Sequence, residues 1–163
     1  MPRNIIKDKA IVEDSFTLIT DPAQLPVDGD VLVDVAVWAE AKPQLQNHSG
    51  QIGVQIPGDF EPEELAEDLK TLDLVAIDFP AFKDGRGYSL ARLLRQRFHF
   101  TGELRATGDV LRDQLFYLQR CGFNSFATRE DRCIEEALTG LSDFTVTYQA
   151  DVHEVRPIYQ RRP

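Results

Sequence analysis

The sequence of 163 residues predicts a single α/β domain, built on an open, mostly parallel sheet with helices on both faces. Segments rich in aliphatic residues alternate with segments whose leucines recur at helical spacing. The run Leu74–Phe79 is almost continuously apolar, as in a parallel strand that is covered on both faces. Three or four successive strand–helix units imply right-handed crossovers, and a partial β/α barrel is the alternative arrangement of such units.

The first seventy residues give the less regular part of this pattern. Pro43 has to lie in the first turn of a helix or break it. Pro62 and the acidic residues after it are typical of a helix start, because the helix dipole favours negative charge there. The expected elements are two short strands around a turn at residues 7–9, a buried strand or strand-to-helix junction at 31–37, a short helix at 38–46, a strand at 51–56 and a helix at 62–69.

The second half alternates clearly between strands and helices. Asp109 is expected to cap a helix that Gly122 terminates, since glycine adopts the left-handed conformation found at helix ends. The final segment FTVTYQA alternates apolar and polar residues, which favours a strand, and a basic tail follows it. The expected elements are strands at 74–79, 103–106, 123–127 and 144–150, and helices at 88–98, 109–120 and 130–141.

Composition excludes several classes of protein. The net charge of −9 argues against nucleic-acid binding, which needs a surplus of basic side chains. No apolar run approaches the length of a membrane span, and the N-terminus lacks the features of a secretory signal, so we expect a cytoplasmic protein that binds no membrane. The two cysteines have no metal-binding or redox spacing, and we interpret them as small buried apolar residues.

Charge is distributed unevenly along the chain. Residues 1–78 have 16 acidic and 5 basic side chains, whereas residues 79–120 have 4 acidic and 8 basic side chains. A cationic region on an acidic protein favours a small anion or the acidic surface of a partner as ligand. The alternative is that these arginines only solvate the exposed faces of amphipathic helices.

The loop FPAFKDGRGYS follows the apolar strand 74–79 and carries the strongest candidate site. In α/β folds ligands bind at the carboxyl ends of the strands, and the helix after this loop points its free N–H groups at the same space. The alternative is a simple turn in which Arg86 pairs with Asp84. The candidate anion-binding residues of the loop are Lys83, Arg86, Gly87, Tyr88 and Ser89.

Arg105 lies near the end of the next strand, so a parallel sheet is expected to bring it beside Arg86 on the same anion. Equally, Arg105 can form a salt bridge with Asp78 or Glu103. We treat Asp78 and Asp84 as candidate acid–base residues. The three histidines are far apart and have no metal-ligand neighbours, so no metal site is predicted. The question of a cofactor stays open.

The stretches FPAFKDGRGYSLARLLRQRF and GELRATGDVLRDQLFYLQRCGF closely resemble the bacterial family called domain of unknown function 934. Asn124 follows RCGF where an aspartate is commoner in the family. The resemblance implies a setting beside sulfite reductase in assimilatory sulfate reduction. It leaves two expectations. The first is an accessory protein that binds a small oxyanion, sulfite reductase or another sulfur-assimilation enzyme. The second is a small oxidoreductase or other enzyme that acts on a sulfur oxyanion or a nucleotide-linked sulfate. Whether the protein is an enzyme stays open, and a homo-oligomer is a further candidate assembly.

Overall fold

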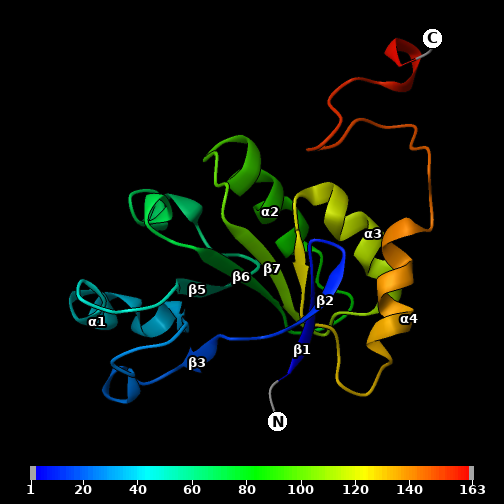
Figure 1. Cartoon of the computed structure of the whole chain (residues 1–163). Coiled ribbons are helices and arrows are strands. Elements are labelled where there is room, and N and C mark those ends of the chain that lie inside the picture. Colours follow the sequence, from blue (N-terminus) through cyan, green and yellow to red (C-terminus); the bar gives the residue numbers. More distant parts are fainter. Residues whose placement is uncertain (1–2, 162–163) are drawn as a thin grey trace.

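The computed structural model describes residues 3–161 and contains one sheet of eight strands (Figure 1). The strands are β1 (Asn4–Lys7), β2 (Ala10–Glu13), β3 (Thr17–Ile19), β4 (Val31–Asp34), β5 (Ile52–Pro57), β6 (Leu74–Phe79), β7 (Glu103–Gly108) and β8 (Ser125–Phe126). The α-helices are α1 (Val35–Leu45), α2 (Arg86–Gln96), α3 (Arg112–Cys121) and α4 (Ile134–Thr139).

The strand order is β2-β1-β8-β7-β6-β5-β4-β3. Strands β3 to β8 are parallel and lie in sequence order, and the antiparallel hairpin of β1 and β2 is added beside β8. When each new parallel strand is added on the same side, right-handed crossovers place every connecting helix on the same face. The predicted α/β fold is therefore confirmed, and its arrangement is the partial barrel: a curled half-barrel whose helices cover one face and not both.

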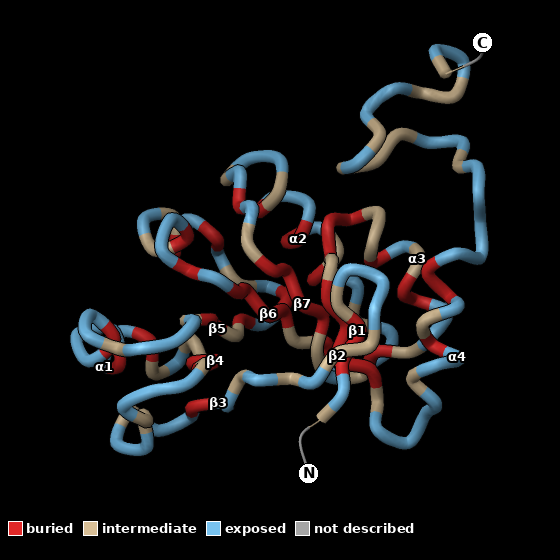
Figure 2. Tube along the Cα trace, in the orientation of Figure 1, coloured by how far each residue is buried: buried red, intermediate tan, exposed pale blue. Residues whose placement is uncertain are grey.

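The main core lies between the sheet and its helices, and Figure 2 shows buried residues concentrated along the central strands. A second, smaller core lies on the concave face and contains Leu32, Leu74 and Ala76, with Phe16 packed against them. Phe16 belongs to the link between β2 and β3, which passes across the concave face. The link between β2 and β3 therefore covers the concave face near the amino ends of the parallel strands.

Local signals explain where the helices begin and end. The Asp34 carboxylate accepts the Ala36 N–H at 2.9 Å and caps α1. Pro43 lies near the end of α1, and not in its first turn as expected. The carbonyl left without a donor there belongs to Ala39, which is exposed to solvent, so the proline is tolerated. Gly122 has φ +116° and terminates α3, as predicted.

Several expected elements differ from those observed. Residues 62–69 form two short 3-10 helices, Pro62–Leu65 and Asp68–Lys70, and neither has a side-chain cap at its start. Asp109 does not cap α3; Leu111 precedes the helix, and the Gln114 side chain accepts the Leu111 N–H at 2.9 Å. The segment 144–150 forms no strand, and its apolar side chains stay in solvent.

Candidate functional site

Four polar side chains lie on the concave face toward the carboxyl ends of four neighbouring parallel strands: Asp34, Gln55, Asp78 and Thr107. Asp34 pairs with Gln55, and Asp78 pairs with Thr107, in the register of the sheet. They share the face of the small core because alternate residues of a strand point to the same side. All four are half-buried. Since Phe16 covers only the other end of this face, the carboxyl end is the part that can receive a ligand.

Asp78 has an unusual electrostatic environment. Burial raises the pKa of its carboxyl group, and the negative charge of Asp34 raises the pKa further, while a hydrogen bond from Thr107 acts in the opposite direction. A carboxyl group with a raised pKa in a partly open position suits acid–base chemistry. Asp78 therefore remains the acid–base candidate that the sequence suggested, and Asp34, which the sequence did not single out, is its neighbour.

Gly108 lets the ends of β6 and β7 come close at this site. It has φ +89°, and a Cβ atom at this position would lie 2.3 Å from the Phe79 carbonyl oxygen and 2.8 Å from Asp78 Oδ1. Only glycine fits both the backbone conformation and the contact. The Asp109 N–H also donates to the Phe79 carbonyl at 2.7 Å, which ties the two strand ends together beside Asp78.

Arg86 is bound by two carboxylates at the start of α2. Its Nε and Nη2 atoms donate to Asp84 at 3.0 and 2.6 Å, and Nη1 donates to Asp59 at 2.5 Å. The hydrogen bond with Arg86 lowers the pKa of Asp84 to about 2. Asp84 is therefore ionised at neutral pH and acts as the partner of Arg86, which makes it a poor proton donor. The pairing of Arg86 with Asp84 is the alternative that the sequence left open.

The other residues of the predicted anion loop lie in different environments. Lys83 and Ser89 are exposed, whereas Gly87 is buried. A Cβ atom on Gly87 would lie 2.7 Å from the Phe79 ring, so this glycine allows α2 to pack closely on β6. Tyr88 is half-buried, with ring centroids 5.4 Å from Phe79 and 5.3 Å from Tyr117. Lys83, Arg86 and Ser89 thus face solvent, while Gly87 and Tyr88 support the packing.

Arg105 is in the interior, with 2% of its surface exposed. Its Nε and Nη2 atoms donate to Glu103 at 2.9 and 2.7 Å, Nη1 donates to Asp14 at 2.9 Å, and its guanidinium lies over the Phe16 ring at 5.1 Å. Arg105 and Arg86 have no partner in common, and the contacts do not support their expected convergence on one anion. The salt bridge with Glu103, the other expectation, is present.

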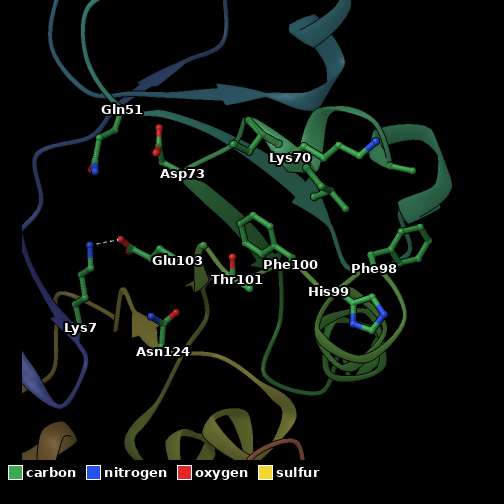
Figure 3. A pocket seen from close by; sticks show the side chains of 14 residues that line it. Lys7, Gln51, Lys70, Asp73, Phe98, His99, Phe100, Thr101, Glu103 and Asn124 are labelled. Atoms are coloured by element: carbon green, nitrogen blue, oxygen red, sulfur yellow. Dashed lines mark ion pairs between the residues drawn. The ribbon is translucent and has the colours of Figure 1, made fainter.

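A polar cavity of about 490 Å³ lies at the amino ends of the strands (Figure 3). The Lys7 ammonium approaches the buried Glu103 carboxylate to 2.6 Å on one side, while Phe98 and His99 line the other side. Asn124, also on its wall, accepts the Leu104 N–H at 2.8 Å and donates to Asp8 at 3.0 Å. These polar groups hold strand ends and the first hairpin together. This cavity is not predictable from local sequence patterns, because its residues come from separate strand starts.

An aromatic surface lies beside the anion loop and is formed by Phe82, Tyr88 and Tyr117. Phe82 and Tyr117 are 49% and 55% exposed. The Gln114 side chain, one turn before Tyr117 on α3, donates to the Phe82 carbonyl at 3.4 Å and holds the loop against this helix. Large aromatic groups are thus presented to solvent next to Arg86, at the carboxyl end of the sheet.

Comparison with known proteins identifies the family. The family model described as "Bacterial protein of unknown function (DUF934)" matches residues 53–159. The chain belongs to the DUF934 family. The match runs from the second residue of β5 through β8 and contains the anion loop, Arg105 and the aromatic surface, and it confirms the resemblance seen in the sequence. No curated protein matches the chain.

Two further observations concern the part of the DUF934 chain that the structure describes. Within residues 3–161, no helix is long and apolar enough to cross a membrane. Over the same part of the chain, His, Cys, Asp and Glu side chains form no group of three or more that is arranged to hold a metal ion.

Proposed function

We propose that the protein is an accessory component of assimilatory sulfate or sulfite reduction that binds sulfite reductase or another enzyme of sulfur assimilation. The sulfur setting follows from the family resemblance. The observation that carries the accessory role is the aromatic surface of Phe82, Tyr88 and Tyr117 beside an exposed arginine. Tyrosine, phenylalanine and arginine are enriched at protein–protein interfaces, and they supply much of the binding energy there.

The arrangement of this surface favours recognition of a protein. Tyr88 meets Phe79 of the core edge-on and contacts Tyr117, so the Tyr117 ring is held in place before a partner arrives. A side chain that is already ordered loses little conformational freedom on binding. Arg86 and Asp59 add an exposed polar rim, and the half-buried Asp84 holds Arg86 from behind. An ordered aromatic centre with a charged rim is the usual anatomy of a docking surface.

A small oxyanion is the second ligand in this proposal, at Lys83, Arg86 and Ser89. Arg86 and Asp59 are more than half exposed, and such ion pairs are weak because water competes for both groups. A doubly charged sulfite or sulfate ion can replace Asp59 at Nη1 while Asp84 keeps the guanidinium in position. The carboxylates of Asp34, Asp59, Asp78 and Asp84 oppose the approach of an anion, so we expect weak binding.

Binding of the purified protein to sulfite reductase tests the accessory role. We expect Tyr117→Ala to weaken the complex at least tenfold, and Tyr159→Ala, which removes a 69% exposed tyrosine elsewhere, to leave it unchanged. Calorimetry with sulfite on the wild type, Arg86→Lys and Arg86→Ala tests the oxyanion, since lysine keeps the charge but loses the planar fork. Absence of binding to sulfite reductase and other sulfur-assimilation enzymes, together with equal growth of a deletion strain on sulfate, sulfite and cysteine, would refute the proposal.

Asp78 favours a second candidate, an enzyme acting on a sulfur oxyanion or a nucleotide-linked sulfate. Its raised pKa allows the carboxyl group to exchange a proton with a ligand bound between Asp34 and Thr107. Asp78→Asn keeps the shape and removes the titration, so it should abolish turnover of such a substrate while leaving binding to sulfite reductase intact. If turnover persists in Asp78→Asn, this second candidate is wrong.

A further inference from the structure

The segment from Phe144 to Gln149 has the sequence of a strand but pairs with no strand among residues 3–161. Its three apolar residues, Phe144, Val146 and Tyr148, alternate with threonine or glutamine and are 64%, 70% and 79% exposed. Such a run of alternating, largely exposed apolar groups is characteristic of a strand whose sheet is missing. The segment 144–149 therefore lacks a neighbouring strand that would cover its apolar side chains.

The same segment is held at both ends against its own chain. The Phe144 ring packs on Phe116 with centroids 5.0 Å apart, and Arg120 Nη2 donates to the Gln149 carbonyl at 2.8 Å. Arg120 also pairs with Asp151 at 3.1 Å. Between these anchors the apolar side chains are exposed, while Arg161 Nη2 donates to the Thr147 and Tyr148 carbonyls at 2.5 and 3.4 Å, a contact that must open when a partner strand binds. The anchors hold the segment beside α3, which reduces the entropy lost on binding.

The opposite end of the sheet supplies an unpaired strand. Within residues 3–161, β3 ends the strand order and pairs only with β4. The Thr17 N–H donates to the Asp30 carbonyl at 2.9 Å, so in a parallel ladder the N–H and C=O groups of Leu18 point away from β4. The Leu18 side chain is 48% exposed, and nearby Val27 is 89% exposed. Open backbone groups beside exposed apolar side chains form a template for another strand.

Charge is complementary between these two regions. Residues 13–30 include five acidic side chains and no basic one, whereas residues 155–163 include three arginines and no acidic side chain. Figure 1 shows β3 and the carboxyl-terminal segment on opposite sides of the molecule, so β3 cannot receive the segment of its own chain. A second copy of the chain satisfies the requirements of both regions.

We propose that the segment 144–149 of one copy adds as a ninth strand along the free edge of β3 of another copy. Its apolar face then meets Leu18 and extends the small core of Phe16 and Leu32 on the concave face. Arg156 and Arg161, which follow it, exchange their contacts with Glu154 and the Thr147 carbonyl for the acidic region around β3. This is strand addition to a sheet edge, in which backbone hydrogen bonds supply affinity and alternate side chains supply specificity.

Sedimentation equilibrium on the intact protein tests this assembly. We expect the wild type to show a mass above that of the monomer, which increases with concentration. Val146→Asp and Leu18→Lys should each shift the protein to the monomer, because each places a charge on the joined face. The matched control is Val155→Asp, which changes a 72% exposed valine outside the alternating run and should associate as the wild type does.

A disulfide experiment identifies the contact itself. Chains with Leu18→Cys are mixed with chains with Val146→Cys, both in a Cys133→Ser background because Cys133 is exposed. We expect the mixture to form a cross-linked dimer under mild oxidation, and neither chain alone to do so to the same extent. A monomeric wild type at all concentrations, equal association of Val146→Asp and Val155→Asp, or no preferential cross-link would each overturn the proposal. Failure here leaves the binding of sulfite reductase unaffected, since that assay uses Tyr117.

Discussion

Replacement of Arg105 by methionine removes the central charge of a buried network and should strongly destabilise the fold. Glu103, whose side chain is 5% exposed, then keeps only Lys7 as a charged partner, and Asp14 loses the Arg105 guanidinium. Breaking a buried ion pair by removing one partner costs about 3–5 kcal/mol, because the remaining charge is left uncompensated. That is a large part of the roughly 5–15 kcal/mol by which a domain is stable.

Urea unfolding followed by the fluorescence of Trp38, the single tryptophan, measures this effect. With a slope of about 2 kcal/mol per molar urea, a loss of about 4 kcal/mol lowers the midpoint by about 2 M. The control is Arg86→Met, which removes an arginine that also contacts two carboxylates but is exposed, and which should leave the midpoint unchanged. Two results would contradict this reasoning: a loss of less than about 1 kcal/mol of unfolding free energy in Arg105→Met, or equal losses in the two variants. Either would show that the buried Arg105 stabilises the fold no more than the exposed Arg86 does.

The pH dependence of the same pair gives an independent measurement. Burial by itself raises the pKa of Glu103, but the charge of Arg105 and the hydrogen bond from Lys7 outweigh it, and the pKa lies below its usual value of 4.5. A depressed pKa means that the stabilisation is present above 4.5 and is lost as the pH falls through the value in the folded state. The difference in stability between the wild type and Arg105→Met should therefore shrink in acid. A difference that stays constant between pH 7 and pH 3 would contradict this account.

Three further changes test the site and the core. Gly108→Ala should lower stability by about 1–3 kcal/mol from its left-handed backbone alone, measured by urea unfolding, with exposed Gly85→Ala as the control. Asp78→Asn should raise the melting temperature at pH 7, because a carboxyl group whose pKa is raised in the folded state destabilises the fold when it is ionised. The advantage should disappear below pH 4, and an unchanged melting temperature at pH 7 would contradict the burial of Asp78. Asp68→Ala should cost about 1–2 kcal/mol and alter the Trp38 emission, because Asp68 accepts the Trp38 indole N–H at 2.8 Å; an unaltered spectrum would show that this bond is absent in solution.

Local patterns in the sequence were sufficient for the central elements of the fold. The strand 74–79 and the helices predicted at 88–98 and 109–120 were placed to within about three residues, because apolar periodicity and a glycine stop act over a few neighbouring positions. The same local character explains the errors at Pro43 and Asp109. Whether a proline is tolerated, or an aspartate caps, depends on solvent exposure and on partners elsewhere in the chain.

The tertiary structure decided how the charged residues are used. Arg86 and Arg105 are similar in sequence context, since each lies near a strand end with glycine close by. The register of the sheet places Arg105 under Phe16, between Glu103 and Asp14, and leaves Arg86 in solvent. Pairing with a residue 91 positions away cannot be inferred from spacing.

The sequence by itself determined a mostly parallel α/β fold with β6 as a buried strand, because alternating strand and helix patterns allow few other connections. Only the tertiary structure decided that the helices cover one face, that Asp34 lies near Asp78, and that residues 144–149 pair with no strand of the described chain. Each of these three features depends on the order of the strands in the sheet and on the curvature of the sheet that results from this order. Strand order is fixed by packing between distant segments, and no local pattern of residues records it.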